Sequence, residues 1–122
     1  LDVSARTVPL SARPLCAVLQ AGRGRLCWAW YRVDGGAWRR VSDFRVGTVS
    51  DLASTTEETT LFAGEVDAQS EIVLHERLGS RALLPPLTER TRPPRVLAEL
   101  AWRRFVAGQV DDVAALTPTY AQ

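Results

Sequence analysis

Short apolar runs joined by glycine-marked turns open this chain. A run at residues 15–19 is followed by Gly22-Arg23-Gly24, and a β-branched and aromatic run at residues 26–33 is followed by Asp34-Gly35-Gly36. Glycines between apolar runs are typical of β-hairpin turns, because these turns need positive φ angles that glycine adopts without steric cost. Two hairpins in succession predict an antiparallel meander of three strands.

After the meander, apolar runs alternate with helical patterns. The third strand extends over residues 38–49 with an interruption near Ser42-Asp43, and Ser50-Asp51-Leu52 is typical of a cap that opens a short helix. The remaining expected elements are a strand at residues 59–63 that ends at Gly64, a helix at 67–78, a strand at 81–84, a proline-bearing loop at 85–94 and a helix from Pro94 to Gly108. We therefore predict an α/β fold with a mixed sheet and the order β-β-β-α-β-α-β-α, which characterises ribonuclease-H-like and actin-like ATPase lobes.

The strand at residues 26–33 carries apolar side chains on both faces. Trp28 and Trp30 lie on one face, and the apolar residues that alternate with them lie on the other. Such a strand is typical of the middle of a sheet, which makes these tryptophans core residues. The four tryptophans and fifteen arginines of the chain would also suit an RNA-contacting module, in which aromatic rings stack on bases, but we favour the core interpretation.

The helix that begins at Pro94 has apolar residues at three- and four-residue spacing. Leu97, Leu100, Ala101 and Phe105 follow this spacing. Residues so spaced share one side of a helix, and we therefore expect a single buried stripe.

The only cysteines, Cys16 and Cys27, lie one on each strand of the first hairpin. A turn centred on Gly22-Arg23 places Cys27 opposite Val18 and gives the two cysteines a diagonal relation, with about 7–8 Å between their Cα atoms. This separation is too long for an easy disulfide, so we expect two small buried side chains. With a single histidine, His75, and no Cys-x-x-Cys motif, we expect neither a zinc site nor a nucleophilic cysteine.

The acidic pairs of the chain flank no histidine and no nucleophile. These pairs are Glu57-Glu58, Glu65-Asp67 and Asp111-Asp112. A catalytic dyad needs at least one desolvated carboxyl group with a raised pKa, and acids on loops usually stay solvated. We therefore expect no catalytic residue.

Two glycine sites support a weak hypothesis of nucleotide binding. Backbone N–H groups near Gly22 and Gly24 suit a phosphate, as glycine turns do in actin-like ATPases, and Gly64 ends a strand where a nucleotide-binding relative would place adenosine contacts. The first turn has neither the lysine nor the helix start of a P-loop. Because a hairpin turn needs glycine in any case, we favour the structural interpretation and expect no cofactor, with ATP as the alternative.

The length of 122 residues and the net charge of +1 suit one domain over residues 1–122. No apolar stretch reaches the ~20 residues that span a bilayer, so we expect no membrane segment and a cytoplasmic location. Residues 1–8 resemble the end of a helix and methionine is absent, which indicates that the chain begins inside a longer gene product.

Three stretches carry a family resemblance, namely AVLQAGRGRLCWAWYRVDGGAW at residues 17–38, PPRVLAELAWRRFVAGQVDD at 93–112 and ALTPTYAQ at 115–122. They resemble the C-terminal half of the TsaB (YeaZ) family, which assists synthesis of threonylcarbamoyladenosine in tRNA. Around its first turn the family shows Asp-Ala-Arg and Gly-Glu-Val-Tyr, where this chain has Gln20-Ala21-Gly22 and Gly24-Arg25-Leu26-Cys27. An amide and a cation thus replace two carboxylates of the family.

The resemblance implies the second of two similar actin-like lobes, without its N-terminal lobe. It also implies a noncatalytic scaffold in tRNA threonylcarbamoyladenosine synthesis, with a TsaD-like catalytic subunit and a TsaE-like ATPase as partners of the intact protein. Two other classes stay open: an ATP-binding lobe that uses the glycine turns, and a module that contacts tRNA directly. The sequence also leaves a homodimer open.

Overall fold

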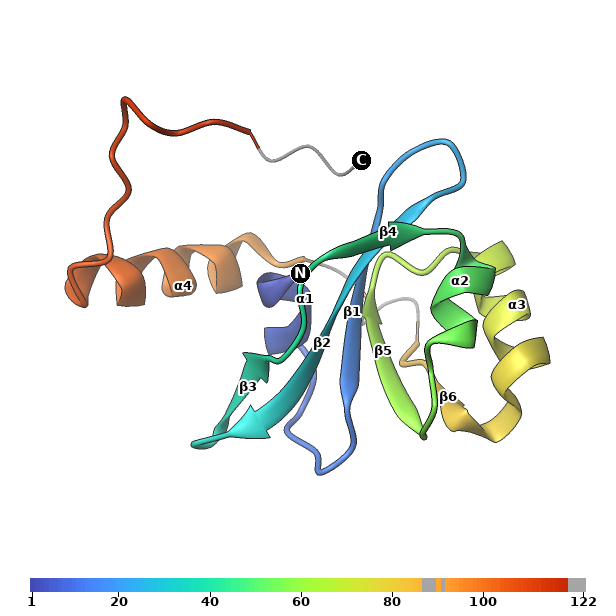
Figure 1. Ribbon diagram of the computed structural model, residues 1–122. Helices are drawn as coiled ribbons and strands as arrows, with labels where there is room; N and C mark the ends of the chain where they lie inside the picture. Colours follow the sequence, from blue (N-terminus) through green and yellow to red (C-terminus); the bar gives the residue numbers. More distant parts are fainter. Residues whose placement is uncertain (87–89, 91, 119–122) are drawn as a thin grey trace.

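The computed structural model describes residues 1–86, 90 and 92–118 (Figure 1). Within these residues one mixed sheet has the order β3-β2-β1-β5-β6, and β4 pairs with β2. The strands are β1 (Leu15–Gln20), β2 (Leu26–Asp34), β3 (Ala37–Arg40), β4 (Arg45–Gly47), β5 (Thr60–Gly64) and β6 (Ala82–Leu83). Strand β2 is antiparallel to β1, β3 and β4, whereas β5 is parallel to both β1 and β6.

The helices follow the predicted order. They are α1 (Asp2–Arg6), α2 (Val49–Ser54), α3 (Ala68–Leu78) and α4 (Pro94–Val106), with a 3₁₀ turn, η1 (Gly79–Arg81), before β6. The order β-β-β-α-β-α-β-α is confirmed, with the third strand divided into β3 and β4. No helix in the described ranges combines the length and the apolar character that a membrane crossing requires.

The predicted interruption near Ser42-Asp43 lies between β3 and β4. Here the Val41 N–H donates to the Trp30 carbonyl at 2.8 Å, and the Trp30 N–H donates to Ser42 Oγ at 2.9 Å. A side-chain oxygen thus replaces a ladder partner where the third strand bends away from β2. This substitution satisfies the backbone of β2 while its neighbour changes from β3 to β4.

Helix α2 begins at a different residue from the predicted one. Its N-cap is Thr48, whose hydroxyl accepts a hydrogen bond from the Asp51 N–H, while the Asp51 carboxylate accepts one from the Thr48 N–H. This is a capping box, in which the third helical residue supports the cap. The predicted cap at Ser50-Asp51-Leu52 is therefore wrong, because Asp51 is the inner member of the box.

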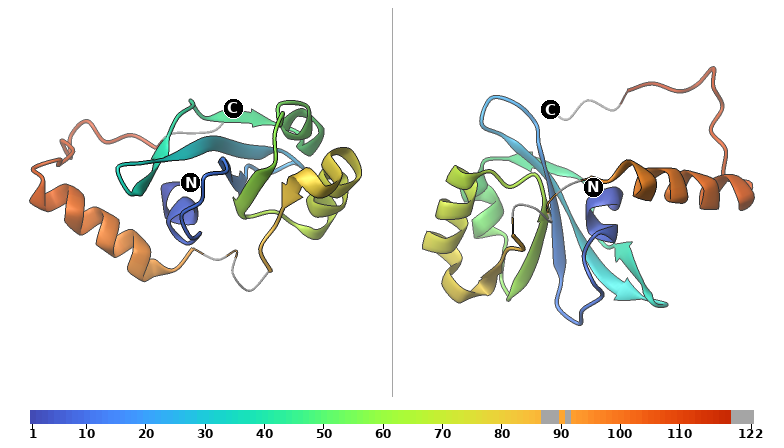
Figure 2. Two further views of the ribbon diagram at one scale, coloured as in Figure 1. Left: turned by 90° about the horizontal axis from the view of Figure 1, so that it is seen from below. Right: turned by 180° about the vertical axis from the view of Figure 1, so that it is seen from behind.

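Helices lie against both faces of the sheet, as expected from the apolar pattern of β2 (Figure 2). Helices α2 and α3 cover one face, over a core of residues Cys16, Val18, Leu26, Trp28, Leu52, Ala53, Phe62, Val66, Leu74, Leu78 and Ala82. Helix α1 covers part of the other face, over residues Ala5, Leu15, Ala17, Ala29, Tyr31, Trp38 and Ala63. The Tyr31 hydroxyl donates to Asp2 Oδ1 at 2.6 Å and Trp38 Nε1 donates to the Val8 carbonyl at 2.9 Å, which attaches the N-terminal segment to the sheet.

The register of the first hairpin differs from the predicted one. Cys27 lies opposite Leu19, and Cys16 lies opposite Trp30, one position away from the expected pairing. The turn contains three residues of positive φ rather than two, because Ala21 and Arg25 still pair across it. As a one-residue shift moves a side chain to the other face, the two cysteines lie on opposite faces of the sheet. Cys16 is buried as expected, whereas Cys27 is only half-buried.

Helix α4 extends away from the sheet from a point beside α1 (Figures 1 and 2). Leu97 is 59% exposed and Phe105 is 61% exposed, so the predicted buried stripe is wrong. Trp102 on the same helix is 65% exposed, in contrast to the buried Trp28 and Trp38. The spacing did predict the helix, but within the described chain only Val96 of α4 is buried.

Candidate functional site

The carboxyl ends of the parallel strands β1 and β5 lie side by side, with Val18 opposite Gly64. In open α/β sheets this edge is the usual position of a ligand site. Two of the three sequence-predicted glycines, Gly22 and Gly24, belong to the β1–β2 turn that follows β1, and the third, Gly64, ends β5. This edge is therefore the first candidate for a ligand site.

Gly64 is required by the packing of the two strands. Its φ of +91° is one that other residues rarely adopt, and a Cβ atom there would lie 2.2 Å from the Val18 carbonyl oxygen and 3.1 Å from Ser4 Oγ. The next residue donates its N–H to the same Val18 carbonyl at 2.8 Å. The close approach of two backbones accounts for this glycine without a ligand.

The β1–β2 turn is sufficient to explain Gly22 and Gly24. The Arg25 N–H donates to the Gly22 carbonyl at 3.1 Å, and Arg23 and Gly24 between them have φ of 55° and 70°. With Gly22 itself at φ 75°, the loop has three successive positive φ angles, which glycine adopts without steric cost. A Cβ atom at either glycine would meet open space.

A hollow of about 190 Å³ lies at the strand ends, but it brings together only one of the predicted glycines. Its lining consists of Gln20, Gly64, Glu65, Val66, Asp67 and Arg90, and neither Gly22 nor Gly24 contributes to it. The nucleotide hypothesis placed phosphate and adenosine contacts at the two glycine sites. The structure does not gather them around one space.

Gln20 occupies the centre of the polar contacts in this hollow. Its backbone N–H donates to Glu65 Oε2 at 3.0 Å, and its side-chain Nε2 donates to the Glu65 carbonyl at 3.3 Å and to Asp67 Oδ2 at 3.1 Å. An amide donor therefore stands between two acids. An aspartate, which the TsaB family has at this position, would bring a third carboxylate there, so the amide matches its surroundings in this chain.

The acids of the hollow have structural partners. Asp67 is the N-cap of α3, and the bond that its carboxylate accepts from the Ser70 N–H holds its pKa below the usual value, with the Gln20 amide as a smaller cause. The Glu65 carboxylate forms an ion pair with Arg92. The lowered pKa of Asp67 does not suit a general acid, and two carboxylates do not suit the binding of a phosphate.

Arg90 was not predicted from the sequence, because it lies in the proline-bearing loop, where no periodic pattern indicates burial. The structure buries it against α3: its Nε donates to the Pro85 carbonyl at 2.6 Å, and its Nη1 donates to the Val66 carbonyl at 3.2 Å and to Glu71 at 2.9 Å. This guanidinium holds the pKa of Glu71 below its usual value. Arg90 therefore attaches the loop to α3 and is a structural cation.

The other candidate groups do not assemble into a catalytic arrangement. His75 lies exposed on α3, 3.7 Å from Glu71, and burial raises the pKa of the Cys16 thiol well above its usual value. The pairs Glu57-Glu58 and Asp111-Asp112 are exposed, as expected of loop acids. In the ranges 1–86 and 92–118 and at residue 90, no three His, Cys, Asp or Glu residues are grouped for a metal ion.

Solved structures were found that share this architecture, although no family model and no curated protein matches the chain. A crystal structure of an uncharacterized protein with similarity to peptidase YEAZ from Pseudomonas aeruginosa is 19% identical, with a TM-score of 0.62 over 91% of this chain and 50% of that one. YeaZ from Pseudomonas aeruginosa is 21% identical, with a TM-score of 0.61 over 89% of this chain and 50% of that one. The chain has the YeaZ fold.

The YeaZ fold confirms the predicted class, a mixed α/β lobe of the ribonuclease-H-like and actin-like type. The resemblance read from the sequence stretches is thereby confirmed for the fold, which is what a likeness at 19–21% identity establishes. The chain spans half the length of these two structures.

Proposed function

We propose that this chain is one lobe of a TsaB (YeaZ)-like scaffold that supports synthesis of threonylcarbamoyladenosine in tRNA without catalysing it. The likeness to YeaZ structures over 91% of the chain carries the proposal. The sequence resemblance adds to it, because residues 17–38 and 93–112 form the meander and α4. In this role the intact protein binds a TsaD-like catalytic subunit and a TsaE-like ATPase.

The chemistry of the described side chains supports a scaffold rather than an enzyme. At the strand ends the carboxylates of Glu65 and Asp67 are engaged by Arg92, Gln20 and the start of α3. General-acid catalysis by a carboxyl group at neutral pH needs a raised pKa, whereas the pKa of Asp67 is lowered.

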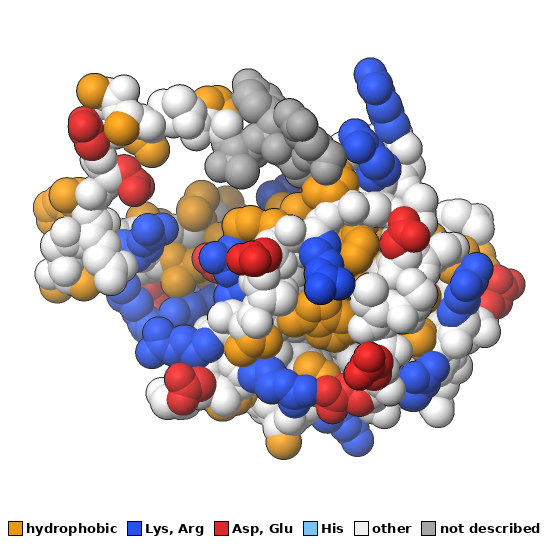
Figure 3. Space-filling model, in the orientation of Figure 1, with side chains coloured by type: hydrophobic (Ala, Val, Ile, Leu, Met, Phe, Trp, Pro, Cys, Tyr) orange, Lys and Arg blue, Asp and Glu red, His pale blue; other side chains and the backbone are white. Residues whose placement is uncertain are grey.

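In this proposal residues 1–122 are the second of two lobes, and the exposed apolar side of α4 packs against the first. Helix α4 has Leu97, Trp102, Phe105 and Val106 each more than half exposed. Figure 3 shows hydrophobic side chains at the surface on the side of the molecule where α4 lies. Since YeaZ structures are twice as long as the part this chain matches, a second lobe of that length is available in such a protein to cover the helix. Burial of these side chains would stabilise the pair of lobes by the hydrophobic effect.

The decisive experiment is reconstitution of the tRNA modification. The protein that contains this chain is coexpressed with the TsaD-like and TsaE-like subunits of its own organism, and threonylcarbamoyladenosine in tRNA is measured by nucleoside mass spectrometry. We expect the TsaD-like subunit to copurify, and the modification to stop when the chain-containing protein is left out. Undiminished modification without it, together with no copurification, would contradict the proposal.

A further inference from the structure

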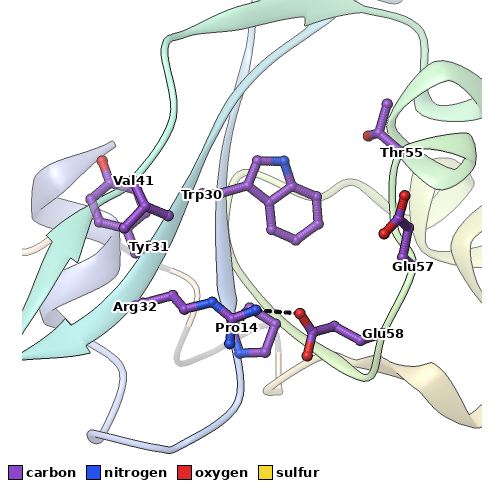
Figure 4. A pocket seen from close by; sticks show the side chains of 8 residues that line it. All are labelled: Pro14, Trp30, Tyr31, Arg32, Val41, Thr55, Glu57 and Glu58. Atoms are coloured by element: carbon purple, nitrogen blue, oxygen red, sulfur yellow. Dashed lines mark hydrogen bonds and ion pairs between the residues drawn. The ribbon is translucent and has the colours of Figure 1, made fainter.

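A second hollow, of about 180 Å³, lies at the opposite end of the sheet, where β2 changes its neighbour (Figure 4). Strand β3 pairs with β2 from Tyr31 onward, and β4 pairs with it only as far as Trp28. Trp30 lies between these two ladders, and its indole lies on the face that α2 and α3 cover. This tryptophan is half-buried, whereas Trp28 is buried.

The loop between α2 and β5 forms the acidic wall of this hollow, with Glu57 and Glu58 (Figure 4). The Glu58 carboxylate forms an ion pair with Arg32, which comes from β2. The Glu57 carboxylate accepts no hydrogen bond from any residue that the structure describes. The lining of the hollow thus holds one cation and two carboxylates next to an aromatic ring, and of the two carboxylates only that of Glu58 is paired with the cation.

The acidic wall is held in place by its backbone. Arg81 Nη1 donates to the Glu57 carbonyl at 3.2 Å and to the Thr56 carbonyl at 3.5 Å. The Thr60 hydroxyl donates to the Glu58 carbonyl at 2.9 Å, and the Thr55 hydroxyl donates to the Leu52 carbonyl at 2.9 Å. Because the loop is already ordered, little conformational entropy is lost when the hollow binds a group.

The hollow is smaller than the usual pockets for drug-sized molecules, and its size suits a side chain. Pockets that bind drug-sized molecules have volumes of about 300–1,000 Å³. A hollow of about 180 Å³ with an open side suits a single side chain that enters from another protein. The matching chemistry is a flat cation, because a guanidinium both pairs with a carboxylate and stacks on an indole ring.

We propose that this hollow binds an arginine side chain of a protein partner, with its guanidinium between Glu57 and the Trp30 indole. The site lies on residues that the YeaZ resemblance does not assign, and its test needs only the isolated chain. It stands independently of the scaffold role.

The test is a titration of the ¹⁵N-labelled chain with the peptide acetyl-Gly-Arg-Gly-amide, observed by NMR at the indole N–H of Trp30. The signal is assigned by its loss in Trp30→Phe. We expect a saturable shift of this signal, and none with the matching citrulline peptide, which has the same shape but no charge. No saturable shift with the arginine peptide, or an equal one with citrulline, would overturn the proposal.

Variants at exposed positions keep the test independent of folding. Glu57→Gln is expected to lower the affinity for the arginine peptide by about fivefold, the effect of losing a solvent-exposed charge pair. Arg32→Gln is expected to raise this affinity by a similar factor, because Glu58 then no longer pairs with Arg32 and is free to pair with the peptide. Glu76→Gln on the exposed side of α3 is the control and leaves the affinity unchanged. Equal affinities for Glu57→Gln and Glu76→Gln would contradict a role for Glu57.

Discussion

Gly64 shows how one residue is determined by a backbone contact that its sequence neighbours do not reveal. The sequence placed it at a strand end, which is correct, and offered adenosine binding as its role. In the structure the backbone of Gly64 lies against the Val18 carbonyl, and a Cβ atom on this residue would be 2.2 Å from the carbonyl oxygen. Its role is therefore explained by the approach of β1 and β5.

We expect Gly64→Ala to lower the free energy of unfolding by about 2–4 kcal/mol, since it adds strain at a positive φ to a clash with backbone. Gly22→Ala is the matched control, because φ there is also positive but a Cβ atom meets open space. This control is expected to cost about 1 kcal/mol. Urea unfolding followed by circular dichroism measures both, and equal costs would contradict the close approach.

The lowered pKa of Asp67 predicts how the stability of the fold depends on pH. Its carboxylate caps α3, and the bond from the Ser70 N–H lowers its pKa from the ordinary 3.8. Because the pKa of Asp67 is lower in the folded chain than the ordinary 3.8, its carboxylate stabilises the fold fully above pH 3.8. This stability is lost as the pH falls through the pKa of the folded state. Acidification from about pH 5 to about pH 2 should therefore destabilise α3 and the fold with it.

Asp67→Asn tests this dependence, because asparagine also caps helices but does not titrate. We expect the variant to lose less stability than the original chain over the same acid range, measured by urea unfolding at each pH. Asp111→Asn, at an exposed position after α4, serves as the control and should follow the original chain. If Asp67→Asn also followed it, the cap would not be the titrating group.

At the scale of elements, α4 shows that the residues that start and end a helix do not decide whether that helix is buried. Pro94 in the first turn and Gly108 after the last turn were sufficient to predict its bounds. Its apolar spacing predicted a buried stripe, yet only Val96 is buried within the described chain. An amphipathic pattern indicates that a face has a partner, and it does not say whether the partner belongs to the same chain.

The two tryptophans Trp28 and Trp102 test this difference with the same substitution. Trp28→Ala, at 2% exposure, is expected to cost about 3–5 kcal/mol of unfolding free energy. Trp102→Ala, at 65% exposure, should change it by less than about 0.5 kcal/mol in this chain. Thermal unfolding measures both. A large loss for Trp102→Ala would show that α4 packs on the chain itself.

At the scale of the whole molecule, the charges at the strand ends predict that no nucleotide binds there. Glu65 and Asp67 line the hollow there, and its Arg90 is engaged with Glu71 and two carbonyl oxygens. A triphosphate brought to this edge would meet the carboxylates of Glu65, which is paired with Arg92, and of Asp67. Repulsion and the missing donors therefore make binding unfavourable.

We expect ATP with magnesium to leave the melting temperature of the chain unchanged, because a ligand raises it only by binding the folded state. Differential scanning fluorimetry over a range of ATP concentrations measures this. A melting temperature that rises with ATP concentration would support the alternative of an ATP-binding lobe. Under the same conditions a tRNA retardation assay at several salt concentrations tests the RNA-contacting alternative.

The sequence by itself determined the elements, their order and the mixed sheet, because strand alternation, glycine turns and helix-terminating residues act between near neighbours. It did not determine the hairpin register, which depends on one extra turn residue and moves the cysteines to opposite faces. Gln20 between Glu65 and Asp67, the buried Arg90 and the hollow beside Trp30 were decided only by tertiary structure. Each depends on segments far apart in the chain meeting in space, and no local pattern of residues encodes which of them will meet.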